Sequence, residues 1–160
     1  MAEVTLSRRL YDRLRSEAAR RRLTVEELVN ELHSKALGEP LDPQDMVELH
    51  LKLAEELLAE AETLLAKEEY LQASEKAWGA AAHAVKALAA KEGRELLCHS
   101  DLWRYVSDLA TKLGDVELRR LWRTANVLHQ NFYEGWMPPE DVEAAVEDVK
   151  LSVEKLKKLL

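Results

Sequence analysis

The stretch LRRLWRTANVLHQNFYEGW, residues 118–136, decides the fold class and holds the candidate site. Its apolar side chains recur at helical spacing, which gives one helix a continuous packing face. Asp115 can cap the start of this helix, and Gly135 can end it in the left-handed conformation. The residues that define the packing face are Leu118, Trp122, Ala125, Phe132 and Trp136.

His129 lies within this apolar stripe, where a titratable side chain is unusual. Its neighbours on the flank of the helix are polar or basic: Asn126, Tyr133, Arg119 and Arg123. One interpretation is a core histidine hydrogen-bonded to a neighbour, because buried polar groups are usually satisfied structurally. The other is an imidazole that acts as an acid or base beside a fixed cation.

Length and composition indicate an all-α protein of one domain, or of a small domain with an appendage. The chain has 160 residues, 47% of them hydrophobic and 33% charged, with five Gly, four Pro and one Phe. Long stretches of Ala, Leu, Glu, Lys and Arg are typical of helices. Three Asn and three Gln among so many charges are typical of a thermophile.

The sequence indicates a cytoplasmic protein without a membrane partner. No run approaches the ~20 apolar residues that span a bilayer, and no signal peptide is recognisable. The single cysteine, Cys98, excludes an intramolecular disulfide and suits a reducing compartment. The five His residues are dispersed and there is no Gly-rich phosphate loop, so we expect neither a metal nor a cofactor.

Positive charge concentrates near the N-terminus of an otherwise acidic chain. The net charge is −7, but between Arg8 and Arg22 seven Arg face one Asp and one Glu, a local charge of +5. Residues 3–7 alternate polar and apolar side chains, which predicts a short strand. Ser7 and Thr24 can each cap a following helix.

A cluster of helix-breaking residues, GEPLDP at positions 38–43, marks the expected domain boundary. We expect a strand–helix–helix arm over residues 1–40 and an up-and-down bundle of about five helices over residues 41–160. Alanines recur along one face of residues 70–91, which predicts a closely packed neighbouring helix.

The arm resembles the ribbon–helix–helix fold, in which two chains pair their strands and lay the ribbon in the DNA major groove. This resemblance implies a homodimer, and the charge pattern implies DNA phosphate contacts from Arg8, Arg9 and Arg13. Two features fit poorly: Arg22 stands where that family usually has Gly, and Glu3 would face phosphate. An arm that only dimerises, or packs on the rest of the chain, stays an alternative.

Residues 44–160 resemble the HEPN superfamily of helical bundles and, more narrowly, the PaREP family of archaeal proteins. The stretches that carry the resemblance are QASEKAWGAA at 72–81, HSDLWR at 99–104 and LHQNFYEGW at 128–136. HEPN proteins often have an Arg followed, after four to six residues, by a His, and Arg123 and His129 match that spacing. Thr124 departs from the pattern, because Asn or Asp commonly follows the Arg.

The superfamily resemblance implies a metal-independent endoribonuclease, often the toxin of a toxin–antitoxin pair, with its site at a dimer interface. Arg123 and His129 would be catalytic, with Asn126, Tyr133 and Arg119 beside them. RNA can be cut by its own 2′-hydroxyl, which needs a base near neutral pH and a cation on the phosphate. A non-catalytic dimeric module that binds nucleic acid or a protein partner is the alternative.

The geometry of a helix sets a condition on the catalytic pair. Six residues separate Arg123 from His129 by about 9 Å along the axis and about 120° in azimuth. One helix therefore does not bring the two side chains together. Two copies of the helix that cross at a two-fold axis can place Arg123 of one chain near His129 of the other.

Overall fold

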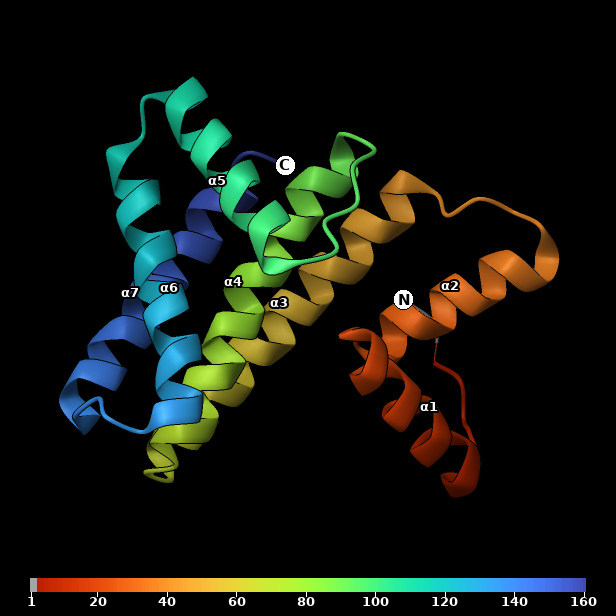
Figure 1. Ribbon diagram of the computed structural model, residues 1–160, viewed down its shortest axis with the longest axis horizontal. Coiled ribbons are helices and arrows are strands. Elements are labelled where there is room, and N and C mark those ends of the chain that lie inside the picture. Colours follow the sequence, from red (N-terminus) through yellow and green to blue (C-terminus); the bar gives the residue numbers. More distant parts are fainter. Residues whose placement is uncertain (1–2) are drawn as a thin grey trace. The chain divides into compact units, whose positions relative to one another are not determined.

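The computed structural model describes residues 3–160, which form seven α-helices and no strand (Figure 1). The all-α class predicted from composition is confirmed. The predicted architecture of about five helices with a strand-bearing arm is wrong. The chain divides into two compact units, Met1–Asp45 and Met46–Leu160.

The first unit is a helical hairpin of α1 (Arg8–Arg21) and α2 (Val25–Leu37). The Ser7 hydroxyl accepts the N–H of Leu10 at the start of α1. At the start of α2 the side chains of Thr24 and Glu27 each accept the other's backbone N–H, which forms a capping box. Arg22 joins the helices in the left-handed conformation with φ 59°, which a residue with a side chain adopts only at a cost.

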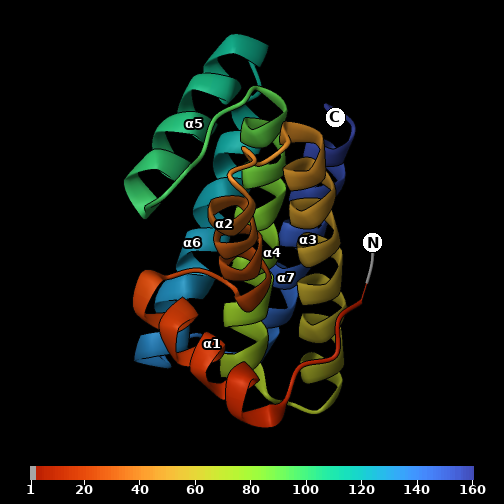
Figure 2. The same cartoon turned by 90° about the vertical axis from the view of Figure 1, so that its right-hand side faces the viewer.

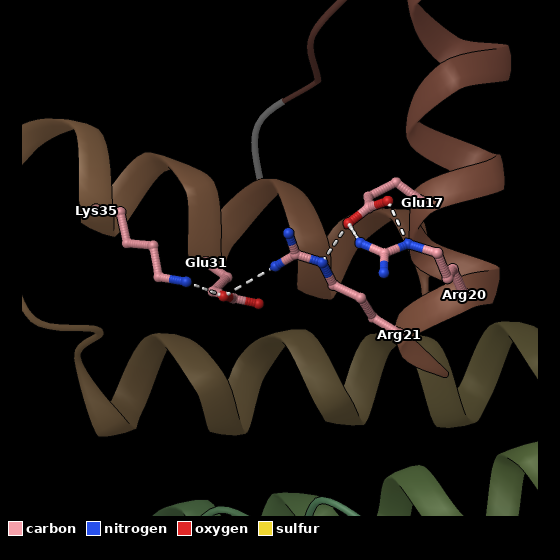
Figure 3. Close-up of polar contacts among 5 residues, drawn as sticks. All are labelled: Glu17, Arg20, Arg21, Glu31 and Lys35. Carbon is pink, nitrogen blue, oxygen red and sulfur yellow. Dashed lines mark hydrogen bonds and ion pairs between the residues drawn. The ribbon is translucent and has the colours of Figure 1, made fainter.

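An ion pair links the two helices of this hairpin and continues into further ion pairs within each helix (Figure 3). Both Arg20 and Arg21 donate to the carboxylate of Glu17, which holds the pKa of Glu17 at about 2 because the arginines favour its charged form. Arg21 also reaches Glu31 on α2 at 3.3 Å, and Glu31 in turn pairs with Lys35. Glu17 and Glu31 thus engage Arg20 and Arg21 near the C-terminal end of the basic segment.

The predicted strand over residues 3–7 is absent: these residues have no regular secondary structure. An alternating stretch of five residues forms a stable strand only when a second strand pairs with it. The described residues supply no such partner within the chain. The ribbon on which the ribbon–helix–helix resemblance depends is therefore missing from residues 3–160.

The second unit is built around three mutually contacting helices, α4 (Tyr70–Lys91), α6 (Val116–Glu134) and α7 (Pro139–Lys157). The long α3 (Pro43–Ala66) lies alongside α4, and α5 (His99–Leu113) is inclined to the others (Figures 1 and 2). No helix in the described part of the chain is long and apolar enough to cross a membrane.

The alanine-rich face of α4 lies at the centre of this unit. Its small side chains allow α6 and α7 to approach closely. The fully buried alanines of α4 are Ala73, Ala77, Ala80, Ala81, Ala84, Ala87 and Ala89. Gly79 continues this pattern toward α3, because a Cβ there would lie 3.1 Å from Leu57 Cδ1. The close packing of α4 fixes the helix that supplies two residues of the candidate site.

The helix α6 forms as its cap residues predict. Asp115 accepts the N–H of Leu118 at 2.9 Å, and Gly135 ends the helix with φ 64°. Trp122 and Ala125 are buried within the chain's own core. Trp136 was predicted on the same face but is 52% exposed, because the left-handed Gly135 turns the chain out of the helical register.

Candidate functional site

A carboxylate from α4 holds the candidate histidine. His129 Nδ1 lies 2.9 Å from Glu75 Oε2, and the side chains are 18% and 30% exposed, respectively. An ionised carboxylate only accepts hydrogen bonds, so Nδ1 carries the proton that is donated to Glu75. In the neutral imidazole this arrangement leaves the lone pair on Nε2, the tautomer that a general base requires.

Aromatic rings fix the orientation of His129 further. Its ring stacks on the Trp78 indole, with centroids 3.9 Å apart and an interplanar angle of 22°. The rings of His99 and Tyr133 meet it edge-on, with centroids at 4.9 Å and 5.2 Å. We call Glu75, Trp78, His99, His129 and Tyr133 the imidazole cluster.

Three helices supply the imidazole cluster at helical spacing. Glu75 and Trp78 are three residues apart on α4, and His129 and Tyr133 are four apart on α6, so each pair shares a helix face. His99 is the first residue of α5. The packing of α6 on α4 thereby places a carboxylate, two imidazoles, an indole and a phenol together.

The start of α5 is fixed by Asp101, which positions His99. The Leu97 N–H donates to Asp101 Oδ2 at 3.0 Å. That hydrogen bond is the main cause that lowers the pKa of Asp101, because it favours the charged carboxylate. His99 is therefore held in an ordered first turn, although it is exposed.

The structure brings only two of the candidate residues on α6 together, His129 and Tyr133. Arg119 instead donates to the Ser107 and Thr111 hydroxyls of α5. Asn126 donates to the Trp122 carbonyl of its own helix at 2.8 Å. Arg119 thus joins α6 to α5, whereas the hydrogen bond of Asn126 stays within its own helix.

Arg123 is exposed and forms no ion pair with the described residues of the chain. Its position on α6, six residues before His129, separates the two by about 9 Å along the axis. Within one chain the guanidinium is thus available to an external anion but does not belong to the imidazole cluster.

The predicted arm residues lie on α1, separate from the ion pairs of the hairpin. Arg8, Arg9 and Arg13 are exposed and make no ion pair in the described part of the chain. The arginines at the other end of α1 are engaged by Glu17. Arg15 and Arg22 are also exposed and make no ion pair with the described residues, so the unpaired cations are not confined to one end of the arm.

Helix packing brings together histidines that are far apart in the sequence. His50 Nδ1 on α3 and His83 Nδ1 on α4 are 3.0 Å apart, and His99 contacts His129. Histidines that are dispersed in the sequence thus meet in the folded chain. Sequence spacing misses these pairs because each joins residues on different helices.

Sequence reasoning also missed Glu75, Trp78 and His99 as members of the site. A signal for them was present, because the stretches that carry the family resemblance, residues 72–81, 99–104 and 128–136, contain all five members of the imidazole cluster. The resemblance pointed to the residues, but only the fold shows that they meet.

Comparison with known proteins identifies the family of the chain. Residues 49–153 match the model of the Archaeal PaREP1/PaREP8 family, and this range contains the whole imidazole cluster. A crystal structure of a protein from Sulfolobus solfataricus is similar, with a TM-score of 0.59 and 28% sequence identity over 66% of this chain and 94% of that chain. No curated protein matches the chain.

Proposed function

We propose that this chain, which belongs to the archaeal PaREP1/PaREP8 family, is a metal-independent endoribonuclease of the HEPN type with His129 as its general base. The observation that carries the proposal is the contact of 2.9 Å between His129 Nδ1 and Glu75 Oε2. It presents Nε2 as the proton acceptor, and the partial exposure of the ring keeps it within reach of a substrate.

The proposed reaction is cleavage of RNA by its own 2′-hydroxyl. His129 Nε2 removes the 2′-hydroxyl proton, and the 2′ oxygen attacks the adjacent phosphorus. General-base help of this kind contributes about 10²- to 10⁴-fold to a rate. The product of this step is a 2′,3′-cyclic phosphate, and no metal ion is required because an imidazole titrates near neutral pH.

Arg123 is proposed to stabilise the charge on the phosphate from a second copy of the chain. Its guanidinium suits phosphate oxygens and has no competing carboxylate among the described residues. Because the helix geometry separates it from His129 of the same chain, the proposal includes a homodimer. On the same HEPN resemblance, we propose an antitoxin protein as a second partner.

Incubation of the purified protein with a mixed RNA pool in the presence of EDTA tests the function. We expect cleavage that EDTA does not inhibit and that His129→Gln abolishes. A glutamine amide can still donate to Glu75, so this variant keeps the link between α4 and α6. His33→Ala, which removes an exposed histidine of α2, is the matched control and should cleave normally. Full activity of folded His129→Gln would refute the proposal.

A second candidate function is nucleic-acid binding by the arm. Arg8, Arg9 and Arg13 favour it because they make no ion pair with residues 3–160, and such cations release counterions when they bind a phosphate backbone. Replacing all three by Ala should weaken binding and reduce its salt dependence, whereas Arg20→Ala should do neither, since Glu17 already engages Arg20. An absence of binding by the native chain at low salt would exclude this candidate.

A further inference from the structure

We infer that His99 is a second proton-transfer residue of the same site, the general acid that protonates the leaving 5′ oxygen. The inference rests on the proposed function and goes beyond it, because it adds a catalytic residue on another helix. It also places the base and the acid of the reaction within a single chain.

Ring geometry carries this inference. The centroids of His99 and His129 are 4.9 Å apart with planes at 63°, so the two imidazoles contact each other edge-on. Trp78 touches both: it stacks on His129 and meets His99 edge-on at 5.1 Å. Three mutually contacting rings from α4, α5 and α6 restrain one another, which is the support that a preorganised site needs.

The roles of the two imidazoles differ because their surroundings differ. Glu75 occupies Nδ1 of His129, so the neutral ring accepts a proton only at Nε2. His129 therefore suits the base, and the leaving oxygen needs a separate donor. His99 is the other imidazole of the cluster and is exposed at the first turn of α5, where it can regain a proton from water after each turnover.

The step balances in atoms and charge. His129 Nε2 takes the 2′-hydroxyl proton while the 2′ oxygen forms a bond to phosphorus. The bond from phosphorus to the 5′ oxygen breaks, and the imidazolium of His99 gives its proton to that oxygen. The products are a 2′,3′-cyclic phosphate and a free 5′-hydroxyl, and the two histidines have exchanged protonation states.

A substrate with a good leaving group separates acid catalysis from every structural role. RNA has a poor leaving group that needs a proton, whereas the nitrophenolate of uridine 3′-(4-nitrophenyl phosphate) leaves without one. We expect His99→Ala to lower kcat on RNA by about 10²- to 10⁴-fold and to change the rate on the nitrophenyl ester by less than about tenfold. His129→Gln should abolish both reactions, because both need the base.

Controls keep this test decisive. His99→Gln should behave as His99→Ala does, and thermal melts should show that both variants fold. The pH–rate profile of His99→Ala on RNA should lose its alkaline limb, which reports a required acid. Equal losses on both substrates, or full activity on RNA, would overturn the role of His99 and leave that of His129 intact. An absence of RNA cleavage by the native chain would overturn the proposed function as well.

Discussion

Asn131 should be the most sensitive polar residue of the bundle, because it joins three segments from a buried position. Its side chain is 1% exposed. The amide Nδ2 donates to Ser74 Oγ on α4 at 3.0 Å, and Oδ1 accepts the backbone N–H of Met137, beyond α6, at 2.8 Å. Asn131→Ala removes both hydrogen bonds and leaves the Met137 N–H without its acceptor.

The expected loss of stability follows from these contacts. Each hydrogen bond contributes about 1 kcal/mol net, and a donor left unpaired in a partly buried place adds roughly 1 kcal/mol or more. Alanine regains a few tenths of a kcal/mol in helix propensity. We therefore expect Asn131→Ala to lower the free energy of unfolding by about 3 kcal/mol, which corresponds to roughly 6–12 °C in Tm for a chain of this size.

Asn126→Ala is the matched control for the assay. Asn126 lies on the same helix, but among the described residues its amide hydrogen-bonds only to the Trp122 carbonyl of its own helix, so its removal should change stability by less than about 0.5 kcal/mol. Denaturant unfolding followed by circular dichroism measures both variants. If Asn131→Ala unfolds at the same denaturant concentration as Asn126→Ala, the reasoning from buried hydrogen bonds is refuted.

Three further predictions concern the stability effects of single residues. Glu68 has φ 59°, a left-handed conformation that strains a residue with a side chain but not glycine, so Glu68→Gly should raise the free energy of unfolding by about 1 kcal/mol. Glu69 has φ −88°, so Glu69→Gly should lower it. Thermal melts compare the two variants. Tyr105→Phe should reduce the loss of stability between pH 10 and 12, because burial raises the pKa of Tyr105 to about 12 and the unfolded chain ionises first. The Leu118 N–H and Lys155 lower the pKa of Asp115 because they favour its charged form. Asp115→Asn should therefore keep the helix cap and lose less stability than the native chain below about pH 4. A titration of the free energy of unfolding against pH checks the predictions for Tyr105 and Asp115.

Local signals in the sequence predict the helices because helix ends are determined by neighbouring residues. The caps at Ser7, Thr24 and Asp115 and the left-handed Gly135 all lie where the sequence indicates. The prediction of a strand over residues 3–7 is wrong for the opposite reason. A strand depends on a distant partner, and alternation within five residues carries no information about whether that partner exists.

Only part of the candidate site could be predicted from the sequence, because its members belong to three helices. His129 stands out by itself, as a polar residue in an apolar stripe. Its contacts with Glu75 and Trp78 depend on how α6 rotates against α4, which helical periodicity within either segment does not determine. The neighbours that share its helix, Asn126 and Arg119, turn instead to their own backbone and to α5.

Mixed dimers can separate the residues that act within one chain from those that act across two. If Arg123 serves the partner's site, a dimer of one Arg123→Ala chain and one His129→Gln chain keeps one intact site. Refolding the two inactive variants together at random should then restore about a quarter of the native activity, since half the dimers are mixed and each has one working site. His99→Ala and His129→Gln should not complement each other, because both residues serve the site of their own chain. Restored cleavage in the second mixture, or none in the first when mixed dimers are shown to form, would contradict this division of the site.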